Sequence, residues 1–570
     1  MKTDYTNETN TLLLVSLLKS HGIRWVIASP GATNVSFVAS VQNDSHFKVV
    51  SAVDERSAAF MACGLAEETG EPVVLSCTGA TASRNYIPGL TEAFYRNLPI
   101  LAITSTLNTG RIGYYVPQLL DRSVQYTDMV KLSVQLPSIH SREELLIGEV
   151  TANKAILELR HRLPGPVHIN LATEYSYDFS VKTLREYRVI KRITSEDSFP
   201  NIPNGKIGVF VGAHLLMTEN ETIAIETFCK KHNAIVLCDQ TSNYRGRYRV
   251  LANLANAQKS NISSKNFDLI VHIGYVSGAY ISFTANEVWR VNPDGELRDL
   301  YGKLKYVFEM NEIDFFKHYS FGEDLDDSLI TRCNGEREEL VTKIGNLPFS
   351  NIWIAKETAG SLPKQAVLHL GILNSLRAWN FFETPATVAC YSNTGGFGID
   401  GCMSSIIGAA IAAPQKQFYL VLGDLAFFYD VNSLCNSIPN NVHILIVNNG
   451  IGVEFKNYNH RVALFGDDAD EYMAACGHNG QKSTSLIKNY AANLGIDYYS
   501  AQGKEEYTAV RDKWMTANGK PSILEVFTEP SDESKALEIM NSLIIDHKNM
   551  LIQRLKKFKL AQVALKAIRR

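Results

Sequence analysis

Several features are scarce or absent in the sequence, and each absence excludes a class of protein. The 570 residues include nine cysteines, none spaced as CxxC, which argues against a structural zinc site and favours reduced thiols. No apolar run approaches the ~20 residues that a membrane-spanning helix needs. The apolar run 11–18 follows Asp4 and Glu8, unlike a signal peptide. A net charge of −3 provides no basic surface for nucleic acid. We therefore expect a cytoplasmic globular protein that binds no nucleic acid.

The length predicts several domains, because 570 residues exceed what one hydrophobic core holds. Apolar strand runs alternate with helical patterns in three blocks, which is typical of parallel sheets with helices on both faces. We predict an α/β protein of three doubly wound domains, at residues 1–185, 200–345 and 355–545, followed by a basic amphipathic helix at 546–570. The expected strands are 25–28, 48–52, 72–77, 100–104 and 167–170, then 207–211, 234–238, 269–273 and 287–292, then 387–391, 418–422, 443–447 and 522–526.

The middle block lacks a dinucleotide-binding signature. After its first expected strand, 207–211, the chain reads Gly212-Ala213-His214, whereas a Rossmann site requires GxGxxG at this position. We interpret the block as a structural domain. A nicotinamide or flavin site is the alternative.

Two strand ends in the third block carry hard oxygen ligands. Strand 418–422 runs into Gly423-Asp424, and strand 443–447 runs into Asn448-Asn449. Ligands of open α/β folds bind outside the carboxyl ends of the strands, and carboxylate and amide oxygens suit Mg²⁺ better than zinc. Glycines at 423 and 450 would let a phosphate approach the backbone. The pattern predicts a metal that holds a diphosphate.

These residues resemble the GDG…NN signature of thiamine diphosphate enzymes, with Leu425 in place of the third glycine and a slightly shorter gap. Other motifs of that superfamily occur in the right order between about residues 10 and 540. They are Ser29-Pro30-Gly31, Val53-Asp54-Glu55-Arg56, Thr78-Gly79-Ala80-Thr81 and Gly165-Pro166-Val167-His168-Ile169-Asn170. The chain is therefore identified as a member of this superfamily, and the resemblance implies thiamine diphosphate and Mg²⁺ as cofactors.

The resemblance implies roles for individual residues. Glu55 would bind the pyrimidine ring of the cofactor and promote loss of the thiazolium C2 proton, from an apolar pocket that includes Val53, Ala58 and Ala59. The alternative is a surface glutamate in the first turn of a helix. Ile399 would support the bent cofactor; otherwise it is an ordinary core residue. Further implied cofactor contacts are Pro30, Gly31, Thr78, Gly79, Asn393, Gly398, Gly423, Leu425 and Ala426.

The implied metal ligands are Asp424, Asn449 and the backbone carbonyl at Ile451. The alternative for Asn449 is a turn asparagine before Gly450. Gln118 would contact the reacting carbonyl, or else be an exposed loop residue. His460 and His478 lie beyond the metal motif, in a segment that would cover the pocket. Each would contact the substrate or else remain solvated.

Three further stretches are Tyr391-Ser392-Asn393, Gly398-Ile399-Asp400-Gly401 and Gly423-Asp424-Leu425-Ala426-Phe427-Phe428-Tyr429-Asp430-Val431-Asn432. In these stretches the chain most resembles the succinyl-enolpyruvyl-hydroxycyclohexene-carboxylate synthases of the menaquinone pathway, and acetolactate synthases less closely. The basic residues that those synthases use for a polycarboxylate substrate are mostly replaced. Thr33 and Thr394 occupy two of the positions, and Arg377 retains one arginine if a small gap is allowed. Because each charge-assisted contact contributes roughly 1.5–3 kcal/mol, we expect a different substrate.

The leading hypothesis is a carboligase that decarboxylates a 2-oxo acid and transfers the acyl carbanion to an acceptor carbonyl or enone. The alternatives are a non-oxidative 2-oxo acid decarboxylase and a non-catalytic cofactor-binding scaffold. Glu55 and Asp424 lie in different blocks, and the family builds its site across a subunit interface, so a homodimer or homotetramer is expected. Segment 546–570 is either a solvated helix or a weak contact for a membrane surface or partner.

Overall fold

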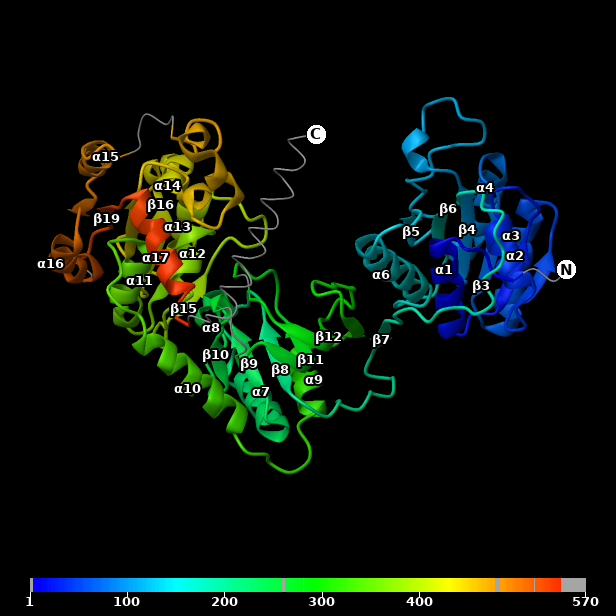
Figure 1. Cartoon of the computed structure of the whole chain (residues 1–570), viewed down its shortest axis with the longest axis horizontal. Coiled ribbons are helices and arrows are strands. Elements are labelled where there is room, and N and C mark those ends of the chain that lie inside the picture. The colour runs from blue at the N-terminus through cyan, green and yellow to red at the C-terminus, as the bar shows by residue number, and fades with distance from the viewer. Residues whose placement is uncertain (1–3, 259–261, 280, 477–481, 517, 545–570) are drawn as a thin grey trace, which may run out of the picture. The chain divides into compact units, whose positions relative to one another are not determined.

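A computed structural model describes residues 4–258, 262–279, 281–476, 482–516 and 518–544. The chain forms two compact units. Unit 1 falls within Met1–Phe199 and Asp294–Glu309, and unit 2 within Pro200–Pro293 and Met310–Arg570. The strands form parallel sheets with helices between them (Figure 1), which confirms the predicted α/β class. The boundaries of the three expected domains stay predictions.

Unit 1 contains a parallel sheet in the order β2-β1-β3-β4-β6-β5. One buried cluster, with Leu14, Phe37 and Ile156, includes residues of α1, α2 and α6; a second, with Ala59 and Leu90, includes residues of α3 and α5. The strands are β1 (Trp25–Ala28), β2 (Lys48–Ser51), β3 (Val73–Cys77), β4 (Ile100–Thr106), β5 (Leu132–Leu136) and β6 (Val167–Ala172). The helices are α1 (Thr9–Ser20), α2 (Val35–Gln42), α3 (Glu55–Thr69), α4 (Thr81–Asn85), α5 (Ile87–Tyr95) and α6 (Arg142–Glu158).

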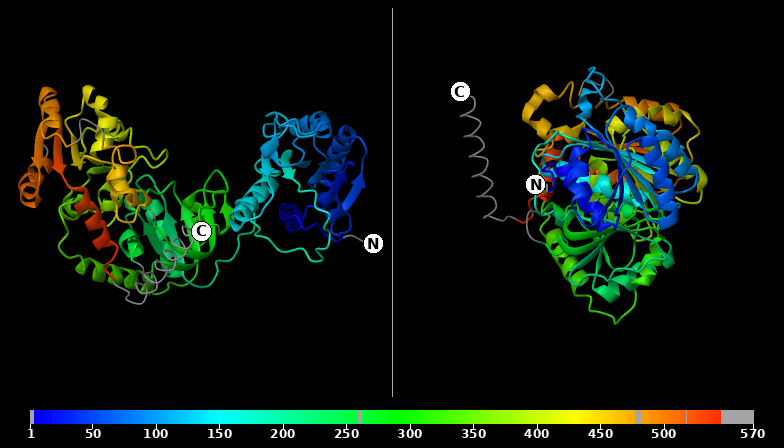
Figure 2. Two further views of the ribbon diagram at one scale, coloured as in Figure 1. Left: turned by 45° about the horizontal axis from the view of Figure 1, so that its top comes forward. Right: turned by 90° about the vertical axis from the view of Figure 1, so that its right-hand side faces the viewer.

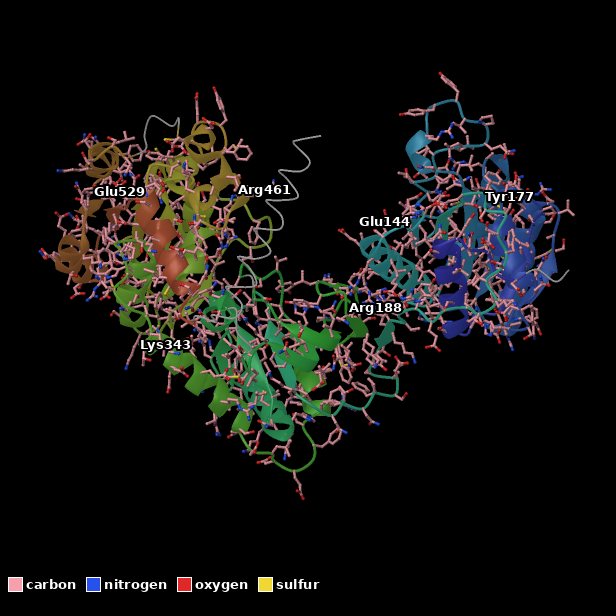
Figure 3. The ribbon with its side chains drawn as sticks, in the orientation of Figure 1. Glu144, Tyr177, Arg188, Lys343, Arg461 and Glu529 are labelled. Carbon is pink, nitrogen blue, oxygen red and sulfur yellow. The ribbon has the colours of Figure 1, made fainter. Side chains whose placement is uncertain are left out.

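The charged segment before residue 200 is partly ordered into a strand of unit 1. Here β7 (Lys191–Ile193) pairs in parallel with β13 (Leu304–Phe308). Arg188, labelled in Figure 3, forms ion pairs with Glu149 and Asp299. These ion pairs hold the segment to other parts of unit 1, although its composition suggests a solvated linker.

Unit 2 contains the strand order β10-β9-β8-β11-β12 in its first part. These strands are β8 (Ile207–Val211), β9 (Ile235–Cys238), β10 (Arg249–Leu251), β11 (Asn266–Ile273) and β12 (Thr284–Val291). The helices that follow or separate them are α7 (Glu219–His232), α8 (Asn253–Ala257), α9 (Glu312–His318) and α10 (Ser328–Thr342). Two capping boxes, at Thr218 before α7 and at Asp239, fix where the loops after β8 and β9 end.

The second sheet of unit 2 has the order β15-β14-β16-β17-β19-β18, all parallel. Its strands are β14 (Val367–Leu370), β15 (Ala389–Tyr391), β16 (Phe418–Gly423), β17 (Val442–Asn448), β18 (Asp497–Ala501) and β19 (Ser522–Phe527). Helices lie on both faces (Figures 1 and 2). They are α11 (Asn351–Thr358), α12 (Asn374–Trp379), α13 (Cys402–Ala412), α14 (Asp424–Tyr429), α15 (Leu486–Asn493), α16 (Lys504–Met515) and α17 (Pro530–Met540).

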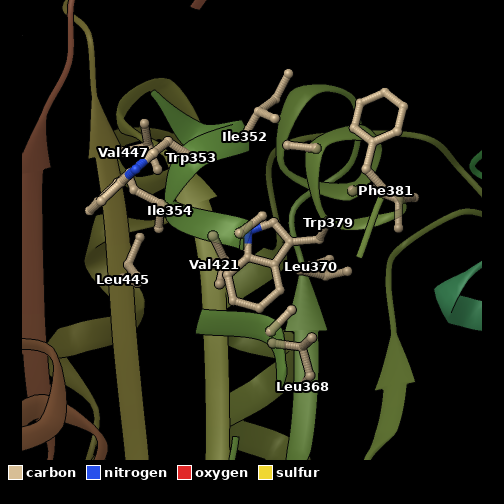
Figure 4. Packing of buried hydrophobic residues seen from close by; sticks show 14 of the residues in the cluster. Ile352, Trp353, Ile354, Leu368, Leu370, Trp379, Phe381, Val421, Leu445 and Val447 are labelled. Carbon is tan, nitrogen blue, oxygen red and sulfur yellow. The ribbon is translucent and has the colours of Figure 1, made fainter. Parts of the chain in front are cut away.

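The core under this sheet fixes α12 at the carboxyl end of β14. Trp379 is fully buried and packs with Leu368, Leu370 and Val421 (Figure 4). A second cluster, with Met403 and Phe427, includes residues of α13, α14 and α15. Burial of such side chains contributes about 1.5–3 kcal/mol each, so the loops that leave the strands start from a rigid base.

The expected strands are all present with small shifts of their ends, but several strands were missed. These are β5, β7, β10, β13, β14 and β18. Each has only three to five residues, too few for a periodic pattern to stand out. Among the described residues, no helix is long and apolar enough to cross a membrane. The predicted basic helix at 546–570 lies outside the described residues.

Candidate active site

The two strand ends predicted to bind a metal are neighbours. In the parallel pair β16–β17, Gly423 is in register with Val447, so Asp424 and Asn449 leave the same edge of the sheet. Both are buried, with 1% and 5% of their surface exposed. Burial raises the pKa of Asp424 to about 7, although backbone N–H groups of Leu425, Asn449 and Gly450 stabilise its charged form. Keeping the carboxyl group of Asp424 ionised inside the folded chain therefore costs free energy.

The unsatisfied atoms at this edge suit a hard cation. Oδ2 of Asp424 is buried without a hydrogen-bond partner in the described part of the chain. Among the described residues, Oδ1 of Asn449 accepts one hydrogen bond, of 3.3 Å, from the backbone N–H of Ile451. Within the described residues no three His, Cys, Asp or Glu side chains converge, so the available donors are oxygens of a carboxylate, an amide and the backbone. That donor set is the kind that Mg²⁺ prefers.

The neighbouring loops leave backbone accessible beside these oxygens. Gly450 has φ +74°, a conformation that favours glycine. A Cβ at Gly423 would meet only the carbonyl oxygen of Val447, at 4.0 Å. Leu425 and Ala426 form the first turn of α14, and Leu425 lies against Gly452 in the loop that follows β17. The space at Gly423 fits the approach of a diphosphate group.

The loop after β15 places three more candidates at the carboxyl edge of the same sheet, because β15 pairs with β14 and β14 with β16. Asn393 accepts a 3.1 Å hydrogen bond from Ser405. A Cβ on Gly398 would lie 2.2 Å from Asp400 Oδ1, so a side chain there requires a shift. Ile399 is half-buried and packs against the core cluster that contains Phe427. Ile399 is thus held by the core while part of its side chain remains free.

In unit 1 the loops after β1 and β3 are in contact. A Cβ on Gly31 would lie 2.5 Å from Thr78 Cβ, so the close approach requires glycine. Thr33 Oγ1 lies 2.5 Å from Thr78 Oγ1 and accepts a 3.2 Å bond from the N–H of Gly79. Pro30, beside them, is exposed. Thr33, predicted as a substrate contact, therefore uses its hydroxyl to bind the loop that carries Thr78 and Gly79.

Glu55 is the first residue of α3 and is only half-buried. Its Oε2 accepts a 3.2 Å bond from Asn85. The apolar pocket expected around it is wrong for unit 1 alone, since Val53 is 80% exposed. Ala58 and Ala59 are buried, but they belong to the core cluster of unit 1. Ala58 and Ala59 lie three and four residues after Glu55, on the same side of α3, so the wall that is missing beside Glu55 is the one expected from Val53.

Gln118 is exposed and has φ +64°. Arg122, four residues later, was missed by sequence reasoning. It is 1% exposed, and its Nη2 donates to Asn170 (2.9 Å) and to the carbonyl of Ser105 (3.2 Å). Burial lowers its pKa to about 10. A Cβ on Gly79 would lie 2.9 Å from Arg122 Nη1, so Arg122 fixes the segment that carries Gln118 beneath the Thr78-Gly79 loop.

Unit 2 holds a cavity of about 440 Å³ next to the loop that follows β17. We call it the asparagine cavity, because seven of its seventeen lining residues are asparagines. Its walls come from α8, α11, α12, α17 and the segment that starts at Val453, two residues after Ile451. The lining residues are Asn253, Asn256, Ala257, Asn351, Ile352, Asn374, Arg377, Ala378, Phe381, Val453, Glu454, Asn457, Asn459, His460, Glu533, Leu537 and Asn541.

Two of the predicted substrate residues, Arg377 and His460, line this cavity, whereas Thr394 does not. Arg377 is ion-paired with Glu454. Asn374 also holds Glu454, donating to its Oε2 (2.9 Å) and accepting from its backbone N–H (3.0 Å). Nδ1 of His460 accepts a hydrogen bond from the backbone N–H of Val462 (3.2 Å). His460 directly precedes Arg461, which is labelled in Figure 3.

Thr394 is buried instead beside Gly278, whose Cβ position is 3.1 Å from the Thr394 methyl. His478 lies outside the described residues. Sequence reasoning missed Glu454 and Glu533, which line the cavity. For Glu454 the one available signal was its position three residues after Ile451, an implied metal ligand. For Glu533 the sequence offered no local signal, because this residue follows β19 and not β17.

Comparisons with known proteins agree with this geometry. Residues 9–126 match the N-terminal thiamine pyrophosphate binding domain of thiamine pyrophosphate enzymes, and residues 374–526 match the C-terminal one; thiamine pyrophosphate is another name for thiamine diphosphate. A protein from Phocaeicola vulgatus is 30% identical over 569 residues, covering 94% of this chain and 98% of the relative. One from Bacteroides thetaiotaomicron is 29% identical over 568 residues with the same coverage. Both are named 2-succinyl-5-enolpyruvyl-6-hydroxy-3-cyclohexene-1-carboxylate synthase.

The chain therefore belongs to the thiamine pyrophosphate enzyme family. It is a thiamine diphosphate-dependent enzyme of the lyase or transferase class, acting on carbon–carbon bonds. A relative from Flavobacterium johnsoniae with the same printed name is 26% identical over 550 residues, covering 90% of this chain and 95% of that protein. The family predicted from the motifs, and the resemblance to these synthases, are confirmed.

Proposed function

We propose that the enzyme is a Mg²⁺-dependent carboligase, which decarboxylates a 2-oxo acid and joins the remaining acyl group to an acceptor carbonyl or enone. The observation that carries this proposal is the asparagine cavity. It has about 440 Å³, within the range of small-molecule sites, and its wall continues the loop of Ile451. A carboligase needs room for a second molecule beside the cofactor, and this cavity provides it.

Asp424, Asn449 and the backbone carbonyl of Ile451 hold the metal in this proposal. The buried, unpartnered Oδ2 of Asp424 supports it, because a cation would offset the cost of burying the carboxylate. The same observation argues against a non-catalytic scaffold with a decayed site. Gly423, Leu425 and Ala426 receive the diphosphate, while Asn393, Gly398 and Ile399 bound the rest of the cofactor. When bound, thiamine diphosphate would supply an acidic ring carbon as the nucleophile and a cationic thiazolium ring as the acceptor of the electron pair that decarboxylation releases.

Glu55 exchanges a proton with the pyrimidine ring of the cofactor in this proposal, and Pro30, Gly31, Thr78 and Gly79 line its surroundings. Gln118 orients the reacting carbonyl, and Arg122 holds its segment in place. Glu55 is half-exposed in the single chain, and a carboxylic acid with this task works best when desolvated. We therefore propose that the active unit is at least a homodimer, in which Glu55 of one chain and Asp424 of the other serve one site.

We also propose that the substrate of this enzyme differs from the substrate of the synthases to which it is similar. Thr33 is occupied in loop hydrogen bonds, and the charge of Arg377 is balanced by Glu454. A polycarboxylate would therefore meet little excess positive charge at these positions. We propose pyruvate or another small 2-oxo acid as the donor.

All nine cysteines are free thiols, which supports a reducing compartment such as the cytoplasm.

Product analysis tests the proposal. Purified enzyme with thiamine diphosphate and Mg²⁺ is incubated with pyruvate, alone and with added aldehydes or keto-sugars. Carboligation predicts new hydroxy ketones that depend on the acceptor. The alternative is a simple decarboxylase, favoured by His460, whose imidazole ring lines the cavity and can donate a proton. Release of free aldehyde in every mixture would support that alternative and reject the carboligase.

A further inference from the structure

The asparagine cavity has an unusual lining for a site that handles carboxylates. Oδ1 of Asn253, both amide atoms of Asn256 and Oδ1 of Asn351 are buried, yet have no hydrogen-bond partner in the described part of the chain. Asn351 is 4% exposed, and its Nδ2 donates to Ser375 (3.2 Å), which leaves its oxygen free. Buried polar atoms are normally satisfied, so a ligand or ordered water in the cavity would supply the missing partners once these side chains turn toward it.

The charges around the cavity do not favour an anion. Arg377 is balanced by Glu454. Glu533 adds a buried carboxyl group, which accepts bonds from the N–H of Asn351 (3.0 Å) and the hydroxyl of Thr528 (2.7 Å). His460 is engaged with the N–H of Val462. A phosphate or a polycarboxylate would find one acid more than the arginine can balance.

The amides match hydroxyl groups. A primary amide offers two donors and an acceptor oxygen, and a hydroxyl both donates and accepts, so each free amide can bind a hydroxyl without either partner carrying a charge. Asn253 and Asn256 are three residues apart on α8, which places their side chains on one face. Phe381 and Leu537 add apolar surface to the lining, as the C–H face of a sugar ring requires.

We propose that the asparagine cavity binds a neutral, hydroxyl-rich carbonyl compound of monosaccharide size, and that this molecule is the acceptor of the carboligation. The acceptor role rests on the proposed function; the binding does not. In the reaction the C–CO₂ bond of the 2-oxo acid breaks and CO₂ leaves. The acyl carbon forms a bond to the carbonyl carbon of the acceptor, whose oxygen takes up one proton. A hydroxy ketone results, with no net oxidation or reduction.

The test compares binding and turnover on the full-length enzyme loaded with thiamine diphosphate and Mg²⁺. D-xylose, D-glucose and glucose 6-phosphate are titrated by saturation-transfer NMR, and pyruvate turnover is measured with each and with acetaldehyde. We expect the neutral sugars to bind better than the phosphate, and at least one to yield a hydroxy ketone with pyruvate. Asn256→Ala should weaken sugar binding at least tenfold. Because the Asn256 amide makes no described hydrogen bond, this variant should keep its melting temperature.

Matched controls separate the outcomes. Asn489→Ala removes an exposed asparagine on α15 and should leave sugar binding unchanged. If Asn256→Ala misfolds, Asn253→Ala serves the same purpose on the same face. Absence of sugar binding, or tighter binding of the phosphate, while acetaldehyde is still carboligated, would overturn this inference alone. Sugar binding without carboligation of any acceptor would overturn the acceptor role together with the proposed function.

Discussion

The guanidinium group of Arg377 on α12 forms an ion pair with the carboxylate of Glu454, which follows β17. Both side chains are largely buried, with 23% and 17% exposed. Asn374 holds the other carboxylate oxygen. The pair therefore links the loops of two strands that are not hydrogen-bonded to each other, β14 and β17, across the intervening β16.

Removing one partner of this pair should destabilise unit 2 more than removing both. Arg377→Met leaves a partly buried carboxylate without its cation, whereas Arg377→Met with Glu454→Gln does not. Contacting residues typically couple by about 0.5–3 kcal/mol, and we expect a value in the upper half of that range. A double-mutant cycle from denaturant unfolding measures it. The exposed pair Glu339–Lys343, with Lys343 labelled in Figure 3, is the control, expected to couple by only ~0.3–0.5 kcal/mol; equal coupling in both pairs would contradict the prediction.

Asp424→Asn should stabilise the metal-free protein at alkaline pH. The pKa of Asp424 is raised from 3.8 to about 7 by burial, so its contribution to stability is present below pH 4 and lost as pH rises through 7. About three pKa units correspond to at most ~4 kcal/mol. Thermal unfolding with a chelator should show the variant to be more stable than wild type at pH 8, with little difference at pH 4.

Glu533 also has a pKa near 7, but it is present in both proteins and cancels in this comparison. Adding Mg²⁺ and thiamine diphosphate should reverse the order at pH 8, since only the wild type gains the metal. A variant that is less stable than wild type at pH 8 without metal would show that the backbone N–H groups around Asp424 outweigh the cost of burying its charge.

Binding of thiamine diphosphate should require a divalent cation. Asp424→Ala should abolish cofactor binding in calorimetry, because the negative charges of the diphosphate then lack compensation. Asp468→Ala, which changes an exposed aspartate elsewhere in unit 2, should bind like wild type. Equal cofactor affinity with and without chelator would refute the metal assignment.

Glu55→Gln should retain cofactor binding but slow the reaction by at least ~10²-fold, the usual scale for a lost proton-transfer group. The amide keeps the size and the hydrogen bond of Glu55 but not its exchangeable acid proton. Single-turnover kinetics with pyruvate measure the effect. Glu68→Gln changes an exposed acid on the same helix and should have wild-type rates. Wild-type turnover in Glu55→Gln would reject the role.

Mixing inactive variants should restore activity if the site is shared between chains. In a hybrid dimer of Glu55→Gln and Asp424→Ala chains, one site carries both lesions and the other carries neither. A two-fold interface therefore predicts about half of wild-type activity per hybrid dimer. Mixtures that remain inactive after subunit exchange has been verified by mass spectrometry would show that each site is formed within one chain.

Part of the candidate site could be predicted from local features of the sequence. Gly423-Asp424 and Asn448-Asn449 were correctly placed at the ends of adjacent strands, because an apolar strand run and the residue that ends it are local features. The family and its cofactor followed from such motifs and are confirmed. Glu55 was correctly placed at the start of a helix, but its expected apolar pocket was wrong for unit 1, since Val53 is exposed. The roles of the individual site residues stay predictions.

The sequence by itself thus determined the parallel α/β class, most of the strands and the order of the cofactor motifs, because each depends on a short, continuous stretch of chain. Only the tertiary structure decided that β14 lies between β15 and β16, that Arg377 meets Glu454, and that Asn253, Asn351 and Asn541 surround one cavity. Those contacts join segments up to almost 300 residues apart in sequence. These contacts depend on which helix packs on which strand, and hydrophobic burial selects that packing. Because hydrophobic burial is non-directional, it leaves no local sequence pattern at the polar residues that it brings together.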